Sequence, residues 1–156
     1  MRIDIVSAVG AGPTLLAAFD DALAITGLAN YNLIRLSSVI PPSSVIERAD
    51  STDPKGVWGD RLYVVWADER TAIRGHEVWA GVGWVQDTDT GRGLFVEHHG
   101  HSKLEVENDI ALSLKGLMKT RDVDFGEIHS EVIGGICHGE PICAFVAACY
   151  QSEQWA

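Results

Sequence analysis

Two adjacent serines interrupt the stretch L-I-R-L-S-S-V-I-P-P, at the point where an apolar run meets a pair of prolines. The hydroxyl of the second serine, Ser38, could attack the carbonyl carbon of Ser37, and the tetrahedral oxyanion that forms would need aligned hydrogen-bond donors. β-Elimination of the resulting ester would free the Ser37 carboxylate and leave a dehydroalanine that hydrolyses to a pyruvoyl group. The plain alternative is a pair of turn residues, and the dipeptide alone does not decide between the two.

The surroundings of Ser37-Ser38 say more than the dipeptide, because a second pair, Ser43-Ser44, follows in the same chain. Ser43-Ser44 comes after Pro42 in an expected loop, where we do not expect a strained backbone to be held. Ser37-Ser38 lies where an apolar strand stops abruptly, so that packing can hold a distorted peptide bond. Of the two pairs, Ser37-Ser38 is the better candidate for self-cleavage.

A histidine-rich segment, F-V-E-H-H-G-H, offers Glu97, His98, His99 and His101 as candidate metal ligands or proton carriers. In a strand, Glu97 and His99 share one face while His98 points to the other. A zinc site needs three or four convergent ligands, and this segment supplies two on one face. We therefore expect solvent-facing histidines and no metal, with metal-dependent hydrolysis through the three histidines as an alternative.

Two acids, Asp20 and Asp21, lie next to each other in an expected helix. Neighbours on a helix point about 100° apart, so the two carboxylates cannot act as one bidentate site. Either one acid faces a pocket and the other faces water, or both are solvated.

Size and charge limit the classes of function. A chain of 156 residues fits a single domain with a buried core. The net charge of −10 argues against nucleic acid or an anionic membrane as a partner, because both need clustered Lys and Arg. No apolar run approaches the length of a membrane span, and the first residues do not resemble a signal peptide. The odd number of cysteines, without C-x-x-C spacing, predicts buried free thiols in a reducing cytoplasm: Cys137, Cys143 and Cys149.

Hydrophobic patterning predicts two principal helices and about seven strands. The first helix is capped by Thr14 and stopped by Gly27, with an apolar side that includes Leu15 and Leu23. Ser102 opens the second helix, whose expected apolar side is Leu104, Ile110, Leu114 and Leu117. The expected strands are Ile3–Val9, Tyr31–Leu36, Arg61–Ala67, Glu77–Gln86, Gly93–His98, Glu127–Ile136 and Ile142–Ala147, with a loop at residues 43–57. This pattern favours an α+β fold, with helices packed on a mainly antiparallel sheet.

Three segments together resemble the pyruvoyl-dependent arginine decarboxylases: G-P-T-L-L-A-A-F-D-D-A-L, A-N-Y-N-L-I-R-L-S-S-V-I-P-P and G-L-F-V-E-H-H-G. The family pattern has a helix containing A-F-D, then N-x-N-L-I-R-[IL]-S-S-[IV]-x-P-P, and later a strand with a glutamate. Order and spacing agree over nearly the whole chain, more loosely between Glu47 and Val85. The resemblance implies a layered αββα sandwich that assembles as a homotrimer or a dimer of trimers, with active sites between subunits.

The resemblance also implies that the single domain, residues 1–156, cleaves itself between Ser37 and Ser38. The products would be a β chain of residues 1–37 and an α chain of residues 38–156. Ser38 would become a covalent pyruvoyl cofactor that forms a Schiff base with a basic amino acid and takes up electrons when CO₂ leaves. The implied reaction converts L-arginine to agmatine.

Three further roles follow from the resemblance. Glu97 would deliver a proton to the carbanion, and the apolar residues before it predict a raised pKa for its carboxyl group. Asn32 would form a hydrogen bond near the scissile bond or the Schiff base. Asp20 would pair with the substrate guanidinium, whose geometry suits a bidentate contact.

The chain departs from the family pattern close to the expected substrate side chain. Tyr31 stands in the middle of the N-x-N motif, where a small aliphatic residue is more familiar, and Ala29 stands where glycine is common. Both add bulk, so a decarboxylase of a different basic amino acid is one alternative. A non-processing paralogue that binds a small ligand or serves as an assembly subunit is another.

Overall fold

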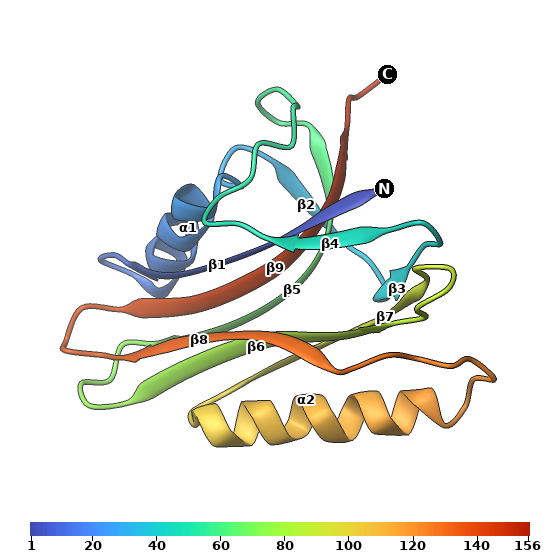
Figure 1. Ribbon diagram of the computed structural model, residues 1–156. Helices are drawn as coiled ribbons and strands as arrows, with labels where there is room; N and C mark the ends of the chain where they lie inside the picture. Colours follow the sequence, from blue (N-terminus) through green and yellow to red (C-terminus); the bar gives the residue numbers. More distant parts are fainter.

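Two β-sheets lie face to face between two helices in the computed structural model, which describes residues 1–156 (Figure 1). The first sheet has the order β2 (Asn32–Arg35), β5 (Arg61–Thr71), β9 (Ile142–Glu153), β1 (Arg2–Ala11) and β4 (Val45–Arg48). The second sheet has the order β3 (Val39–Ile40), β7 (Gly93–Gly100), β6 (Glu77–Gln86) and β8 (His129–Ile136). Helix α1 (Leu15–Thr26) covers the first sheet and α2 (Lys103–Met118) covers the second. The predicted αββα sandwich is confirmed.

Most strand pairs are antiparallel, as predicted, and two are parallel. The longest ladder joins β5 to β9 antiparallel along their whole lengths. The parallel pairs are β1 with β4 and β2 with β5. Each parallel pair joins one outer strand to the first sheet, so β2 and β4 form the two edges of that sheet.

The helix boundaries agree with the caps expected from the sequence. The Thr14 hydroxyl accepts a hydrogen bond from Ala17 N at 3.0 Å, and Gly27 ends α1 with a φ of 88°. The Ser102 hydroxyl accepts a hydrogen bond from Glu105 N at 3.4 Å at the start of α2. Both caps satisfy backbone donors that a helix leaves unpaired at its first turn.

The buried face of α2 differs from the expected one at its first turn. Leu104 is 66% exposed, and the helix packs on the second sheet through Val106, Ile110 and Leu114. These three residues are spaced four apart, so they form one stripe, and Leu104 lies outside it. At Gly83 in β6, any Cβ would collide with Ile110, so this glycine lets α2 lie close to the sheet.

The structure contains two strands that the sequence pattern did not predict. The expected loop at residues 43–57 contains β4, which pairs with β1, and Val39–Ile40 forms β3, which pairs with Leu94 and Gly93 of β7. Both strands are short and take their hydrogen bonds from partners far away in the sequence, so local pattern does not reveal them. Strands β1, β5 and β9 are longer than expected because their backbone pairing continues beyond the apolar runs that the sequence pattern marked.

The main core lies between the sheets, and a second one lies under α1. Cys137, Cys143 and Cys149 are all buried and unpaired, as the sequence predicted. Burial raises the pKa of Cys143 to about 12, and it also raises the pKa of Cys149. Cys143 and Cys149 therefore stay as neutral thiols, and all three cysteines act as small apolar residues in the packing.

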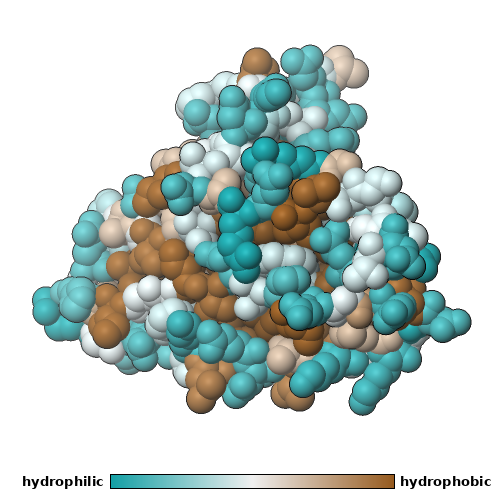
Figure 2. Space-filling model, in the orientation of Figure 1, coloured by the Kyte–Doolittle hydropathy of each residue, from teal (hydrophilic) through white to brown (hydrophobic).

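The surface mixes polar and apolar residues. Figure 2 shows apolar side chains between polar ones near the middle of the face seen in Figure 1. Neither helix has the length and hydropathy to cross a membrane.

Candidate active site

Ser37 and Ser38 form the crossing between the two sheets. Leu36 N still donates a hydrogen bond to Val64 O in the first sheet, whereas Val39 already pairs with Leu94 in the second. The chain therefore changes layers within two residues. Ser38 has a φ of 72°, a left-handed conformation that costs a non-glycine residue of the order of 1–3 kcal/mol. Hydrogen bonds on both sides hold this conformation: the Leu36 bond before it, and one that Phe95 N of β7 donates to Ser38 O at 2.8 Å.

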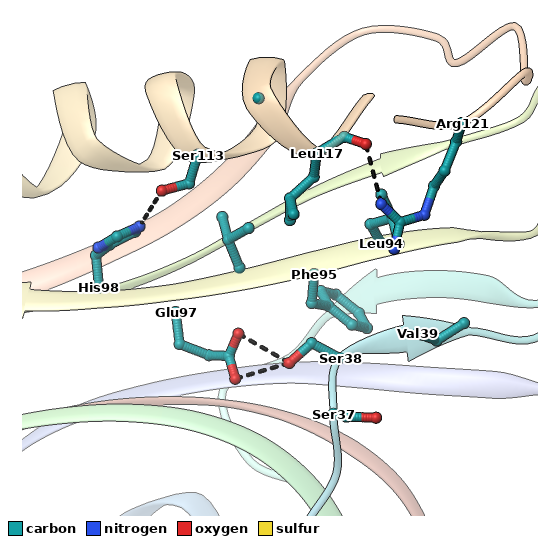
Figure 3. A pocket seen from close by; sticks show the side chains of 12 residues that line it. Ser37, Ser38, Val39, Leu94, Phe95, Glu97, His98, Ser113, Leu117 and Arg121 are labelled. Atoms are coloured by element: carbon teal, nitrogen blue, oxygen red, sulfur yellow. Dashed lines mark hydrogen bonds between the residues drawn. The ribbon is translucent and has the colours of Figure 1, made fainter. Parts of the chain in front are cut away.

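The Ser38 hydroxyl faces the carboxylate of Glu97. Ser38 Oγ lies 2.8 Å from Oε1 and 2.9 Å from Oε2, and both side chains are partly buried (Figure 3). Glu97 and Phe95 point from β7 toward the space between the sheets, and this direction brings both to the crossing. A serine and a glutamate 59 residues apart in the chain thus share a hydrogen bond at the expected cleavage bond.

A pocket of about 480 Å³ opens at this contact. Beyond β3, the edge of β7 has no neighbouring strand, and the pocket extends around that edge to α2 (Figure 3). Its lining comes from the crossing, β7 and the α2 region: Ser37, Ser38, Val39, Leu94, Phe95, Val96, Glu97, His98, Ser113, Gly116, Leu117 and Arg121.

The second serine pair is also strained, contrary to the expectation from its loop position. Ser43 has a φ of 60°, in the turn that follows Pro41 and Pro42. The left-handed residue is here the first serine of the pair, whereas at the crossing it is the second. The Ser44 hydroxyl donates a hydrogen bond to Pro41 O at 2.7 Å, three residues back, and so serves the turn. Backbone strain alone therefore does not distinguish the two pairs, but the partner of the hydroxyl does.

Tyr150 of β9 lies beside the crossing, and sequence reasoning gave it no role. Its hydroxyl donates a hydrogen bond to Val39 O at 2.9 Å. Burial, and to a lesser degree the charge of Glu97, raise the pKa of Tyr150. The only signal in the sequence was a tyrosine at the end of an alanine-rich apolar strand, which does not reveal a contact with the opposite sheet.

The histidines of the F-V-E-H-H-G-H segment do not converge. His98 Nε2 forms a hydrogen bond with Ser113 Oγ of α2 at 2.7 Å, and His99 Nδ1 forms one with Glu69 Oε2 of β5 at 2.6 Å. His101 Nδ1 lies 2.9 Å from Glu77 O. No group of three or more His, Cys, Asp and Glu side chains in residues 1–156 is arranged to hold a metal ion. The alternative of metal-dependent hydrolysis thus finds no support in the geometry.

The two acids of α1 have separate surroundings. Asp21 accepts a hydrogen bond from Ala11 N at 2.9 Å and so fastens the helix to the end of β1. Asp20 is exposed to solvent. Asp20 does not line the Ser38 pocket, and α1 and β3 lie toward opposite sides of the molecule (Figure 1).

The N-Y-N motif lies near a loop rather than near Ser38. Asn32 Nδ2 donates to Gly59 O at 2.6 Å, and the Tyr31 hydroxyl accepts a hydrogen bond from Gly56 N at 3.2 Å. Ala29 is partly buried against the core under α1. Within one chain, the expected site residues therefore form two groups: Ser37, Ser38 and Glu97 in the pocket, and Asp20, Ala29, Tyr31 and Asn32 outside it.

Comparison with known proteins decides the family. A sequence model described as pyruvoyl-dependent arginine decarboxylase matches residues 2–154. The chain belongs to the pyruvoyl-dependent arginine decarboxylase family. The enzyme of that name from Halobacterium salinarum is 36% identical over 152 residues, which cover 96% of this chain and 93% of the relative. The enzyme from Methanococcus vannielii is 32% identical, and the match covers 94% of this chain and 87% of the relative. The enzyme from Thermococcus sibiricus is 30% identical, and the match covers 92% of this chain and 90% of the relative.

Family membership confirms the class that the sequence resemblance implied. Pyruvoyl-dependent arginine decarboxylases are carboxy-lyases, and their family name specifies a pyruvoyl group as the cofactor. Such a group is part of the polypeptide, so no separate cofactor pocket is needed.

Proposed function

We propose that the chain cleaves itself between Ser37 and Ser38 and then decarboxylates a basic amino acid, with arginine as the leading substrate. One observation carries this proposal: a serine with a positive φ, at the crossing between two sheets, directs its hydroxyl at a carboxylate. The strain supplies part of the free energy needed to distort the peptide bond, and Glu97 orients the nucleophile.

Cleavage would proceed in three steps. Ser38 Oγ bonds to the carbonyl carbon of Ser37, the bond from that carbon to Ser38 N breaks, and the nitrogen takes the proton that leaves the hydroxyl. Loss of the Ser38 Cα proton with cleavage of the Cβ–O bond then frees the Ser37 carboxylate. The dehydroalanine at position 38 takes up one water and releases ammonia, which leaves the pyruvoyl group. The sum is one water consumed and one ammonia released.

The residues around position 38 fit a pyruvoyl group. Ser38 O is held by Phe95 N, so the carbonyl next to the new ketone already has a donor. The pocket of about 480 Å³ has room for an amino acid, and Glu97 lines it beside Ser38. A pyruvoyl group supplies a ketone that takes the substrate amine and a conjugated carbonyl that accepts electrons when CO₂ leaves. Glu97 is then within reach to hold and deliver a proton at the carbon that lost CO₂.

We further propose that a second copy of the chain completes the active site. Asp20 and Asn32 lie outside the Ser38 pocket of their own chain, and the edge of β7 beside Glu97 has no neighbouring strand. A homotrimer in which α1 of one subunit faces the Ser38 pocket of the next would bring the two groups together. Asp20, exposed and free to pair, would then bind the guanidinium of arginine.

Tyr31 bears on the choice of substrate. Its ring lies against Gly56, where a Cβ would be 2.6 Å from Tyr31 Cε1, and its hydroxyl accepts from the same residue. Because Tyr31 is held by this loop, its bulk need not enter the space for the substrate side chain. This contact favours arginine over a reshaped specificity.

The proposal is tested by CO₂ release from arginine, lysine and ornithine with purified protein and with two matched variants. Ser38→Ala removes the hydroxyl bonded to Glu97, and we expect it to abolish CO₂ release. Ser44→Ala removes a hydroxyl from the other serine pair, and we expect it to leave CO₂ release from arginine intact. If the wild-type protein releases no CO₂ from any of the three amino acids, the proposed function is wrong.

A further inference from the structure

The short strand after Ser38 is held by hydrogen bonds from both layers. Phe95 N in the second sheet donates to Ser38 O at 2.8 Å, and the Tyr150 hydroxyl from β9 in the first sheet donates to Val39 O at 2.9 Å. Two consecutive carbonyl groups on the C-terminal side of the expected cleavage bond are therefore fixed. Strand β3 itself is only two residues long, so these contacts form much of what holds it.

The position of the Tyr150 ring is set by the core. It packs edge-on against Phe95, with ring centroids 6.1 Å apart and an interplanar angle of 67°. Phe95 is almost fully buried and supplies the other hydrogen bond, through its backbone N–H, to Ser38 O. Tyr150 and the crossing are thus located by the same buried residue, and this directs the hydroxyl at Val39 O.

The Tyr150 hydroxyl stays neutral, so it can act as a hydrogen-bond donor. Burial, and secondarily the nearby carboxylate of Glu97, raise the pKa of the hydroxyl above its ordinary value. The hydroxyl therefore stays protonated at neutral pH and continues to donate to Val39 O.

We propose that Tyr150 is a positioning residue for self-cleavage and for the group that cleavage produces. By holding Val39 O, it keeps Ser38 at a positive φ with its hydroxyl against Glu97. This proposal rests on the proposed function, because it assigns Tyr150 a part in the cleavage of the Ser37–Ser38 bond.

The same contact has a second consequence after cleavage. Residue 38 then becomes a chain end, and chain ends lose order unless they are tied down. The two-residue pairing of β3 with β7 gives little support, so the Tyr150 bond tethers the new end in the pocket. A loosened tether would displace the reacting group while the surface that binds the substrate side chain stays unchanged.

The test follows the cleavage rate of freshly made chain, produced by cell-free translation and separated on denaturing gels over time. Tyr150→Phe keeps the ring packing against Phe95 and removes only the donor, and we expect cleavage to slow roughly tenfold, the effect of one lost hydrogen bond. The matched control is Tyr63→Phe, whose hydroxyl bonds Glu153 on β9. We expect that variant to cleave at the wild-type rate.

A second variant distinguishes the donor from the ring. Para-aminophenylalanine at position 150 keeps an N–H donor in place, and we expect it to restore most of the wild-type rate. In cleaved Tyr150→Phe enzyme, kcat should fall while KM for the substrate stays close to that of wild type.

The outcomes separate this proposal from the proposed function. If wild type cleaves and Tyr150→Phe cleaves equally fast, the positioning role is wrong and the proposed function stands. The role is also wrong if Tyr150→Phe only lowers Tm, or if the amino variant is as slow as Tyr150→Phe. A wild-type chain that stays intact overturns both.

Discussion

At the scale of single residues, the partner of each hydroxyl distinguishes the serine that we propose to be reactive from a structural one. Ser38 and Ser43 both have a positive φ, and both follow apolar or proline-rich sequence. The Ser38 hydroxyl meets the carboxylate of Glu97, whereas the hydroxyl of the other pair, on Ser44, closes a local turn through Pro41 O. The proposed chemistry therefore depends on one carboxylate contributed by a distant strand.

Replacement of that carboxylate should separate cleavage from decarboxylation. In Glu97→Gln the amide oxygen can still accept a hydrogen bond from Ser38, so we expect at least partial cleavage. The amide cannot deliver a proton, so decarboxylation should be lost. Chain fragments on denaturing gels and CO₂ release measure the two steps. Glu107→Gln, an exposed acid on α2, is the control, and full turnover by Glu97→Gln would remove Glu97 from the mechanism.

The neighbouring acids of α1 should respond differently to the same change. Asp20→Asn should raise KM for arginine, because a charge-assisted pair is lost. The increase should correspond to a loss of about 1.5–3 kcal/mol in the free energy of substrate binding. Asp21→Asn should instead leave KM unchanged and lower the free energy of unfolding only slightly, since its amide oxygen can still accept the hydrogen bond from Ala11 N and only the charge is lost. Steady-state kinetics and denaturant unfolding measure the two effects. An unchanged KM in Asp20→Asn would exclude the guanidinium pair.

At the scale of elements, the site depends on a crossing between sheets that takes two residues. Strand β2 ends in the first sheet and β3 begins in the second, so Ser37 and Ser38 must turn sharply between them. Strand β7 brings Phe95 and Glu97 to the same point from one face, and β9 brings Tyr150 from the opposite sheet. Hydrogen bonds to both sheets hold the strained serine in place.

Substitutions of glycine at the contact between α2 and β6, and within α2, should show how closely the helix packs on the second sheet. Gly83→Ala would place a Cβ against Ile110, so we expect the free energy of unfolding to fall by about 1–3 kcal/mol. At Gly116, within α2, an added Cβ meets nothing within 4 Å. Gly116→Ala should therefore raise the free energy of unfolding by roughly 0.5–1 kcal/mol. Denaturant unfolding measures both, and equal shifts of the same sign would contradict the close packing at Gly83.

The sequence predicted the elements that have local signals and missed those that depend on distant partners. Thr14 and Ser102 cap their helices through groups within three residues, and a local pattern can show that. Strands β3 and β4 were missed because their hydrogen bonds come from β7 and β1. The contact of Ser38 with Glu97 spans 59 residues, and only the family pattern connected the two. Tyr150 had no pattern to mark it, since its contact crosses from one sheet to the other.

At the scale of the whole molecule, one chain holds two separate halves of the expected site. Ser38 and Glu97 lie in the pocket at the edge of β7, while Asp20 and Asn32 lie outside it, near α1 and the Gly59 loop. The proposed trimer, which joins the halves across a subunit interface, would account for this separation and for the free edge of β7.

Mixed assemblies test the shared site. Glu97→Gln and Asp20→Asn affect different halves, so a trimer containing both kinds of subunit has some interfaces with both residues intact. With random mixing this is roughly a quarter of the interfaces, and the co-expressed pair should show activity above either variant alone at low arginine concentration. Activity equal to the average of the two separate variants would indicate a site built within one subunit.

The most direct test of the central claim is the mass of the polypeptides in purified wild-type protein under denaturing conditions. Self-cleavage predicts two chains, residues 1–37 ending in a free carboxylate and residues 38–156 beginning with a pyruvoyl group. Their summed mass should equal that of the intact chain plus one water minus one ammonia. The Ser38→Ala variant should give one chain only. A single intact chain of 156 residues in the wild-type protein would contradict the account.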